Sequence, residues 1–431
     1  MIATAPKGTK DVLPGQIHAW RHVEESYREA CRRFGFQEIR TPVFEHTELF
    51  SRGVGGATDI VEKQMYTFDD RAGRSLTLRP EGTASVARAF VENRLYAEMQ
   101  PSKYFYGISC FRYEKPQLGR LREFHQLGAE IFGAGGMLAD AEVICLAADF
   151  LGGLGIGGLD LRVNSVGCPS CRPAYRELLR DFLRPSYDGL CETCRKRLDS
   201  NPMRILDCKS PRCREIAADA PRMLGSLCGP CASAFDELKG HLVAAGLAFT
   251  VDAGIVRGLD YYTKTAFEFV SDGLGAQDTV CGGGRYDGLI EDIGGPGTPG
   301  VGFALGVERL LLAMESSGAK APEPEGADAF IAAMGDGARA AALGLMRRLR
   351  GEGLRVEMDC LGRNIKGQMK LADRLNARYA LIIGDDELRD GVVTIKDMRS
   401  GEQRPVGMRD AASFLRRRDV AEQREENGKG I

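Results

Sequence analysis

Two segments that alternate apolar and polar side chains, residues 105–111 and 124–132, constrain the fold more than any other part of this chain. Alternation with a period of two is the pattern of a half-buried β-strand. Between them, Pro116 and Gly119 mark a turn. The sequence therefore predicts a β-hairpin with a loop long enough to reach over a ligand.

The hairpin carries a cluster of charged side chains. A guanidinium group matches phosphate oxygens in two-point geometry, so several arginines near one turn suit a polyanion whose charge moves during a reaction. The alternative is a solvated, charged hairpin without a ligand, which composition alone favours. The charged residues are Arg112, Glu114, Lys115, Arg120 and Arg122.

Several motifs change that balance. FRYEKPQLGRLREFHQ, residues 111–126, resembles motif 2 of the class II aminoacyl-tRNA synthetases, in the form found in the histidyl-tRNA synthetase family. RGLDYY, residues 257–262, is similar to a signature of that family and its paralogues. Residues 300–310 resemble motif 3, with Ala304 at one of its glycine positions. The helix, strand and proline expected within residues 16–44 resemble motif 1, which forms the dimer interface in class II enzymes. The matches span nearly the whole chain.

Composition sets wide limits on function. The chain has 431 residues, 43% hydrophobic and 27% charged, as in an ordinary globular protein long enough for two or three domains. A net charge of −2 gives no overall preference for nucleic acid, so RNA contacts must come from local basic patches. We expect no signal peptide and no membrane span, and therefore a cytoplasmic protein with reduced thiols.

The resemblance implies an α/β fold of the α+β type. Residues 1–325 would form a catalytic domain built on an antiparallel sheet, with a small helical, Cys-rich insertion at about 168–245. Residues 316–326, which are rich in proline and charge, indicate a linker. Residues 327–418 alternate strands and helices and resemble an anticodon-binding α/β domain with a mixed sheet. Residues 419–431 are a charged tail.

Local patterns predict the elements one by one. Helices are expected at 16–33, from 84, at 139–151, 338–351 and 365–376. Strands are expected at 38–44, about 76–79, 263–269, 327–334, 354–359, 379–383 and 392–397, and a strand followed by a helix at 300–310. Three successive glycines at 282–284 suggest that the backbone approaches something bulky, and the family's adenylate lies there.

Eight of the 13 cysteines fall in four close pairs between residues 168 and 231. Such pairs in a reduced compartment are the sequence form of closed, structural Zn²⁺ sites with four thiolates. Iron–sulfur ligation and buried thiols without a metal are alternatives, and one ion, two or none would be compatible with the pattern. If two ions bind, nesting gives an inner site of Cys191, Cys194, Cys208 and Cys213, and an outer site of Cys168, Cys171, Cys228 and Cys231.

The family resemblance also implies a role for each site residue. Arg112 would bind the α-phosphate of ATP and the histidine carboxylate, and Arg257 would stabilise charge at the α-phosphate. Glu130 and Tyr262 would read the imidazole, and Gln126 and Glu81 the amino group, with Gln126 also helping to deprotonate the tRNA hydroxyl. The remaining expected contacts are Thr83 and Tyr261 for histidine, Glu114, Arg120, Phe124 and Arg309 for ATP, and Gln117 and Arg122 for the tRNA acceptor end.

The expected activity is therefore ATP-dependent activation of L-histidine followed by transfer to tRNA(His), by a homodimer. ATP would come with Mg²⁺, and neither DNA nor a membrane would be a partner. Because the substrate carboxylate attacks the α-phosphate directly, catalysis needs positioning and charge stabilisation but no protein nucleophile. The alternative is the regulatory, histidine-binding subunit of ATP phosphoribosyltransferase, a paralogue that typically lacks the C-terminal domain. Arg112, Arg120, Arg257 and Arg309 favour the enzyme.

Overall fold

The computed structural model describes residues 4–53, 55, 58, 60–206, 208, 210–255, 259–271, 273 and 278–416. The chain divides into two compact units, Met1–Pro322 and Glu323–Ile431, and each is described by itself. Arg257 and the expected tail at 419–431 lie outside the described residues.

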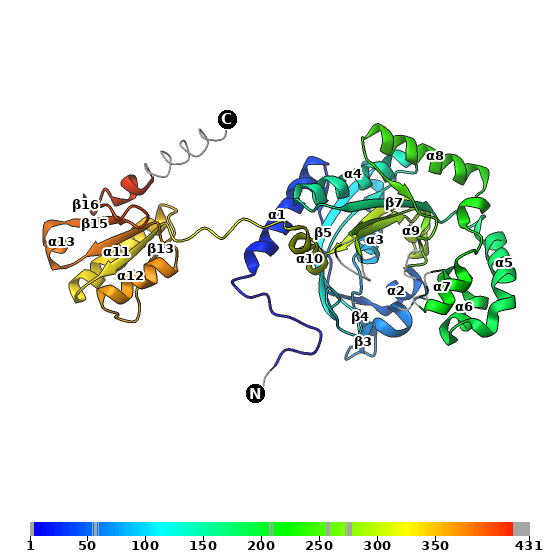
Figure 1. Ribbon diagram of the computed structural model, residues 1–431, viewed down its shortest axis with the longest axis horizontal. Helices are drawn as coiled ribbons and strands as arrows, with labels where there is room; N and C mark the ends of the chain where they lie inside the picture. The colour runs from blue at the N-terminus through cyan, green and yellow to red at the C-terminus, as the bar shows by residue number, and fades with distance from the viewer. Residues whose placement is uncertain are drawn as a thin grey trace. The chain divides into compact units, whose positions relative to one another are not determined.

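The larger unit is built on an eight-stranded sheet with the order β1-β5-β6-β11-β10-β9-β7-β8 (Figure 1). Neighbouring strands are antiparallel except at the two edges, where β1 pairs with β5 and β8 with β7 in parallel. The antiparallel catalytic core implied by the sequence is thus confirmed. The strands are β1 (Gln37–Glu38), β5 (Ser102–Phe111), β6 (Glu123–Phe132), β7 (Leu159–Ser165), β8 (Thr250–Val251), β9 (Thr263–Ser271), β10 (Thr279–Arg285) and β11 (Gly300–Gly306).

The predicted hairpin is the β5–β6 pair, in which Gly107 lies opposite Leu127. β6 pairs with β11 on its other side, so this strand has a hydrogen-bonded neighbour along both edges. Its odd-numbered apolar residues, Leu127, Ala129 and Ile131, belong to one core cluster, while Phe132 belongs to another. The alternation read from the sequence therefore separates the two faces of the sheet.

Helices cover both faces of this sheet. α1 (Ile17–Arg33), α4 (Met137–Gly153), α8 (Gly229–Ala244) and α10 (Val307–Ser317) contribute to the large core cluster on one face. α3 (Thr83–Glu92) and α9 (Leu289–Asp292) pack with Tyr106, Phe132 and Tyr286 on the other. The second face is rich in tyrosine and leaves room for polar groups, and the candidate site lies there.

The single strand expected at 38–44 is wrong, because the chain forms two short strands in different sheets. β1 joins the large sheet, whereas β2 (Phe44–His46) pairs with β4 (Ser75–Leu78), which in turn pairs with β3 (Tyr66–Asp69). Between β1 and β2 the backbone carbonyls of Thr41 and Pro42 accept hydrogen bonds from Arg79 Nη1 at 2.8 and 3.0 Å. A side chain replaces the strand partner there, and Pro42 cannot donate to a ladder.

The Cys-rich insertion is a set of helices between β7 and β8, as expected, and α8 is the last of them. β7 and β8, which flank it, were not predicted. The other helices are α5 (Arg172–Leu183), η3 (Arg184–Gly189), α6 (Glu192–Ser200), η4 (Pro202–Ile205), α7 (Pro211–Ala217) and η5 (Met223–Ser226). Outside the insertion, α2 (Thr47–Gly53), η1 (Ile60–Gln64) and η2 (Leu95–Ala97) complete the helices described for this unit.

The smaller unit is an α/β domain with the mixed sheet that the sequence predicts. Its strand order is β13-β12-β14-β15-β16, with β12 parallel to both neighbours and β15 antiparallel to its own. α11 (Asp336–Gly351) packs on one face, α12 (Ile365–Arg374) on the other. The strands are β12 (Ala329–Ala333), β13 (Val356–Met358), β14 (Tyr379–Ile383), β15 (Val392–Asp397) and β16 (Gln403–Gly407). β16 and α13 (Asp385–Asp390) were missed. Across the residues described, we find no helix that combines the length and apolar character of a membrane span.

Candidate active site

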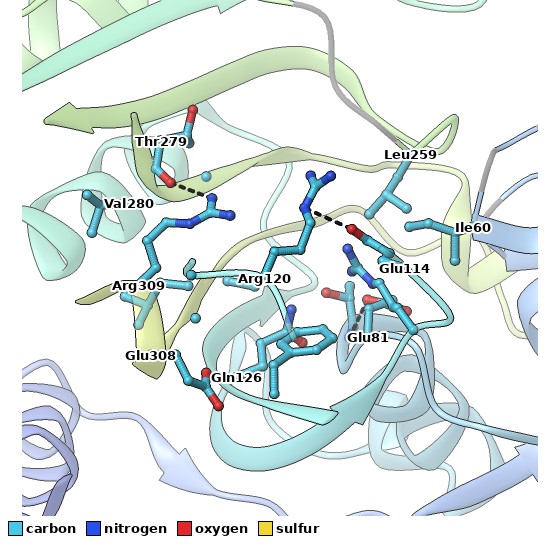
Figure 2. A pocket seen from close by; sticks show the side chains of 18 of the residues that line it. Ile60, Glu81, Glu114, Arg120, Gln126, Leu259, Thr279, Val280, Glu308 and Arg309 are labelled. Atoms are coloured by element: carbon cyan, nitrogen blue, oxygen red, sulfur yellow. Dashed lines mark hydrogen bonds and ion pairs between the residues drawn. The ribbon is translucent and has the colours of Figure 1, made fainter. Parts of the chain in front are cut away.

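A cavity of about 330 Å³ opens on the tyrosine-rich face of the large sheet (Figure 2). Four segments far apart in the sequence meet around it: the β4–α3 turn, the β5–β6 hairpin, the β9–β10 pair and the β11–α10 junction. Its lining includes Glu81, Thr83, Arg112, Glu114, Arg120, Phe124, Gln126, Tyr261, Tyr262, Glu268, Thr279, Gly282, Ala304, Glu308 and Arg309. Ten of the residues expected from the sequence are thus brought to one cavity.

The alternation of β6 determines which side chains reach the cavity. Phe124 and Gln126 line it, while His125, between them, contacts Trp20 and Glu308. Gly128 continues the same row, and a Cβ atom at this position would lie 2.3 Å from Tyr106 Oη. A side chain at residue 128 would therefore displace the Tyr106 ring from beneath the cavity.

Glu130 is fully buried behind Thr83, at the end of the same row. Its carboxylate accepts hydrogen bonds from Thr83 Oγ1 at 2.8 Å, from Tyr106 Oη at 3.0 Å and from Tyr286 Oη. Burial raises the pKa of Glu130 to about 8, although these three hydroxyl donors act in the opposite direction. The carboxyl group is therefore poised to gain or lose its proton near neutral pH.

The β4–α3 turn supplies a second buried carboxylate. Glu81 accepts hydrogen bonds from the backbone amides of Thr83 and Ala84, both at 2.8 Å, at the start of α3. These amides have no partner within the helix, so the Glu81 side chain caps it. Burial raises the pKa of Glu81. Gln126 Oε1 accepts from the Gly82 amide at 2.8 Å, which fixes the turn against β6.

Three arginines line the other half of the cavity, and Figure 2 shows two of them, Arg120 and Arg309. Arg112 donates from Nε to the Pro80 carbonyl at 2.8 Å, with its guanidinium carbon 5.1 Å from the centre of the Phe124 ring. Arg120 pairs with Glu114 at 2.8 Å, and Arg309 donates to the Thr279 carbonyl at 2.8 Å. Burial lowers the pKa of Arg309, and the nearby charge of Arg120 adds to that. Concentrated positive charge of this kind suits phosphate groups.

The glycines at 282–284 are explained mostly by packing within the protein. Gly282 lines the cavity. A Cβ atom at Gly283 would lie 2.3 Å from the Gly302 carbonyl oxygen, and one at Gly284 would lie 2.3 Å from that of Thr265. Close approach to the backbone of neighbouring strands therefore accounts for Gly283 and Gly284, while Gly282 lines the cavity.

The residues expected at the tRNA acceptor end lie on the hairpin loop. Gln117 is exposed and forms a β-bridge with Arg120. Arg122 places its guanidinium carbon 4.1 Å from the centre of the Tyr113 ring and donates to the Glu114 carbonyl at 3.2 Å.

Tyr261 and Tyr262 both line the cavity, with ring centres 4.7 Å apart. Neighbouring residues of a strand point to opposite faces of the sheet. Tyr261 and Tyr262 precede β9 and lie in no strand, so both can face the cavity.

Sequence reasoning missed the groups that hold the expected residues in place. Tyr106 and Tyr286 donate to Glu130, and Glu308 accepts both the amide and the ring Nδ1 of His125 at 3.0 and 2.9 Å. The hydrogen bond and charge of Glu308 raise the pKa of His125. A period of two along residues 105–111 would have placed Tyr106 and Ile108 on one face. Tyr286 is paired with Glu130 only by the fold.

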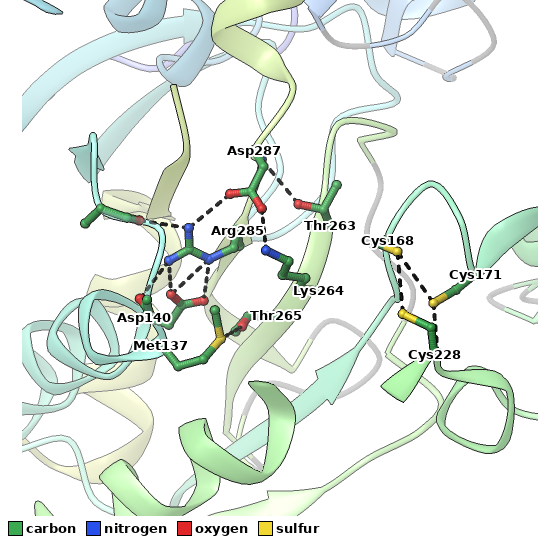
Figure 3. A network of polar contacts seen from close by, with 12 residues as sticks. Met137, Asp140, Cys168, Cys171, Cys228, Thr263, Lys264, Thr265, Arg285 and Asp287 are labelled. Carbon is green, nitrogen blue, oxygen red and sulfur yellow. Dashed lines mark hydrogen bonds and ion pairs between the residues drawn. The ribbon is translucent and has the colours of Figure 1, made fainter. Parts of the chain in front are cut away.

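The eight cysteines of the insertion form two groups, and within each all four sulfur atoms lie within 4.8 Å of one another. The groups are Cys168, Cys171, Cys228 and Cys231, part of which appears in Figure 3, and Cys191, Cys194, Cys208 and Cys213. These are the same two sets that nesting in the sequence suggests. All eight thiols are unpaired by disulfides.

Comparison with known proteins agrees with this geometry. A family model described as histidyl-tRNA synthetase matches residues 8–310, and one described as anticodon binding domain matches residues 328–418. The histidine–tRNA ligase of Caldanaerobacter subterraneus subsp. tengcongensis is 54% identical over 94% of this chain and 97% of its own length. That of Pelotomaculum thermopropionicum is 52% identical over 96% and 98%. The apo crystal structure of S. aureus histidyl-tRNA synthetase superimposes with a TM-score of 0.82 at 38% identity, covering 96% of this chain and all of that one. The chain belongs to the histidyl-tRNA synthetase family of class II aminoacyl-tRNA synthetases.

Proposed function

We propose that this protein is a histidine–tRNA ligase, which activates L-histidine with ATP and transfers it to tRNA(His), releasing diphosphate and AMP. The observation that carries the proposal is one cavity with two chemically different halves. Buried Glu81, with Glu130 behind Thr83, makes one half acidic and hydrogen-bonding, whereas Arg112, Arg120 and Arg309 make the other cationic. An amino acid suits the first half and a nucleotide triphosphate the second.

Activation requires the histidine carboxylate to attack the α-phosphate in line with the departing diphosphate. Arg112, in the cationic half, is held by the Pro80 carbonyl and is close enough to Glu81 to interact with its charge, so it is the proposed contact to both the carboxylate and the α-phosphate. Its guanidinium would neutralise charge as the phosphorus becomes five-coordinate. Arg257 is proposed as the second electrostatic catalyst, on the family signature alone, since it lies outside the described residues.

Histidine selection is proposed to depend on the buried carboxylates. Glu130 and Tyr262 would contact the imidazole, while Glu81 and Gln126 would bind the amino group, with Thr83 and Tyr261 completing the wall. A site whose buried polar groups need a particular partner rejects similar ligands strongly, because those ligands leave the groups unpaired. Three hydroxyl groups donate to Glu130 and hold its carboxyl group in one orientation. A carboxyl group fixed in this way would favour a small ring that presents its nitrogen atom in one position.

ATP would enter as its Mg²⁺ complex. The adenine is proposed to lie between Phe124 and Arg309 beside Glu114, with Arg120 on the phosphates. Mg²⁺ is usually held by phosphate oxygens, waters and one or two carboxylates, and Glu114 and Glu268 line the same cavity. The ion would neutralise the phosphates, while Arg112 and Arg120 orient them.

Transfer would use the hairpin loop and the smaller unit. Gln117 and Arg122 are proposed to meet the acceptor end, where Gln126 assists deprotonation of the terminal hydroxyl. Residues 327–418 are proposed to bind the anticodon, with residues 1–325 as the catalytic domain. The exposed Lys366, Lys370 and Arg374 along α12 support this, because clustered cations attract the phosphate backbone.

A homodimer in the cytoplasm is the proposed form. Val43, Phe44 and Phe68 expose apolar surface on and beside the β2-β4-β3 sheet, and the first two belong to the segment that resembles motif 1. An exposed apolar patch of this kind suits a subunit contact. Light scattering should give twice the chain mass, and Phe44→Glu should reduce it.

The proposal is tested by histidine-dependent exchange of labelled diphosphate into ATP. We expect exchange with histidine and with no other amino acid, and its loss in Arg112→Ala and Arg257→Ala. Arg347→Ala, which removes an exposed arginine on α11 of the smaller unit, should retain full exchange. Histidine binding without exchange would instead identify the regulatory paralogue of ATP phosphoribosyltransferase.

A further inference from the structure

We propose that the insertion holds two structural zinc ions, one in each cysteine group, and that the outer ion helps to fix Tyr262 on the histidine side of the cavity. The inner group is Cys191, Cys194, Cys208 and Cys213, and the outer group is Cys168, Cys171, Cys228 and Cys231. The second half of this inference rests on the proposed ligase function, but the first does not.

The sulfur–sulfur distances fit a single tetrahedral ion. Zn–S bonds of about 2.3 Å in a tetrahedron place the sulfur atoms about 3.8 Å apart. In the outer group Cys168 lies 3.7 Å from Cys171 and 3.9 Å from Cys228, and in the inner group Cys191 lies 3.9 Å from Cys208. An iron–sulfur cluster spreads its thiolates over several metal atoms, so thiolates this close together favour a mononuclear ion.

Backbone amides point at the sulfur atoms, as thiolate ligands require. The Cys228 amide donates to Cys171 Sγ at 3.2 Å, and the Cys191 amide donates to Cys213 Sγ at 3.2 Å. Each bond joins two cysteine pairs of one group, and such outer donors stabilise the charge of coordinating thiolates.

The insertion has two small apolar clusters, and each is built around cysteines of one group. The buried residues of α6 are Cys194 and Leu198, and those of α7 are Cys213 and Ala217. Helices of nine and seven residues with so little apolar burial are not stable alone. Small modules of this kind usually need a metal or disulfides.

The outer group is linked to the cavity through Arg172. This residue directly follows Cys171 and donates from Nη2 to the carbonyl oxygen of Tyr262, which lines the cavity. Beside it, the Val166 amide bonds the Lys264 carbonyl, and the Lys264 amide bonds the Gly167 carbonyl, at 2.7 and 2.9 Å. An ion that fixes Cys168 and Cys171, which lie close together in Figure 3, therefore fixes the loop and helix start that carry these contacts.

Metal analysis of the full-length protein, purified anaerobically without chelator, tests the first half. We expect close to two zinc ions per chain, and one in each of the double variants Cys191→Ser/Cys194→Ser and Cys168→Ser/Cys171→Ser. Cys360→Ser, which changes an exposed thiol of the smaller unit, should retain both. Because the double variants can fail to fold, Co²⁺ substitution of the unaltered protein gives a second measurement, with the visible bands of a tetrahedral tetrathiolate site expected. A metal-free protein with freely reactive thiols, or disulfides within the groups, would overturn the proposal.

Diphosphate exchange with Arg172→Lys tests the second half. We expect the KM for histidine to rise about tenfold, while the KM for ATP and the zinc content stay unchanged. Arg212→Ala, on α7, should leave both constants unchanged. An equal change in both constants, or in neither, would rule out the link to Tyr262 and leave the metal count untouched. Absence of exchange in the unaltered protein would instead contradict the ligase function.

Discussion

Thr83 Oγ1 donates a 2.8 Å hydrogen bond to Glu130, joining the start of α3 to strand β6 of the large sheet. Thr83 lines the cavity, whereas Glu130 lies fully buried behind it. The amide of Thr83 is in turn held by Glu81, so one residue connects the two buried carboxylates. A ligand that reaches Glu130 must therefore pass Thr83 and share the carboxyl group with its hydroxyl.

Glu130→Gln should lower kcat/KM for histidine by about 10- to 150-fold at pH 9, above the pKa of about 8 where Glu130 is ionised, because a hydrogen bond to a charged group is worth about 1.5–3 kcal/mol. The amide keeps the size of the side chain but cannot accept from three hydroxyls and the imidazole as a carboxylate does. Diphosphate exchange measured over a range of histidine concentrations reports the change. The KM for ATP should be unaffected, as should both constants in Glu315→Gln, an exposed change on α10. A matching loss for ATP would argue against a role specific to histidine.

Glu130 should also make stability depend on pH. Burial raises its pKa from 4.5 to about 8, so between these values the folded protein keeps a proton that the unfolded chain loses. Its contribution to stability is complete below pH 4.5 and is lost as the pH rises through 8. Urea unfolding at pH 6, 7, 8 and 9 should therefore show the unaltered protein losing stability relative to Glu130→Gln up to about pH 8 and not beyond. Parallel curves would contradict the raised pKa.

Arg120→Ala should raise the KM for ATP about tenfold or more and leave the melting temperature nearly unchanged. Arg120 is 40% exposed while its partner Glu114 is 9% exposed, and an ion pair that is open to water on the arginine side adds little stability. Its value lies instead in the phosphates that it would contact once it leaves Glu114. Arg404→Ala is a matched control, since Arg404 is 41% exposed and pairs with Glu402 at 2.7 Å in the smaller unit. A fall in melting temperature without a change in KM would make Arg120 a purely structural residue.

The elements with strong local patterns were predictable from the sequence. The β5–β6 hairpin and α12 follow from periodicity alone, because each buries one face against a continuous core. The break between β1 and β2 was not predictable, because Arg79, nearly 40 residues away, satisfies the carbonyls there. Short edge elements such as β8 and β16 carry too few residues for a period to appear.

In the candidate site, too, some residues could be predicted from the sequence and others could not. Residues such as Arg112 and Gln126 could be assigned because a contiguous motif carries them, and both line the cavity. The residues that hold Glu130 in place could not be predicted, because Tyr106 and Tyr286 reach it from separate parts of the chain. Hydrogen-bond partners far apart in the chain leave no periodic signal. The two cysteine groups are an exception, because their residues are far apart in the chain and could still be predicted. A site with four thiolates takes two close pairs, and nesting of the pairs indicates which two belong together.

Gly128→Ala should destabilise the larger unit by about 1–3 kcal/mol and weaken histidine binding in the same variant. The added methyl group would lie 2.3 Å from Tyr106 Oη and must push away a ring that donates to Glu130. Gly240→Ala is the control, because a Cβ atom at Gly240, within α8, meets nothing within 4 Å and alanine favours a helix. We expect that control to keep or raise the melting temperature, with an unchanged KM for histidine. If Gly128→Ala behaved like the control, Tyr106 would be free to move, and the row from Phe124 to Glu130 would not depend on its position.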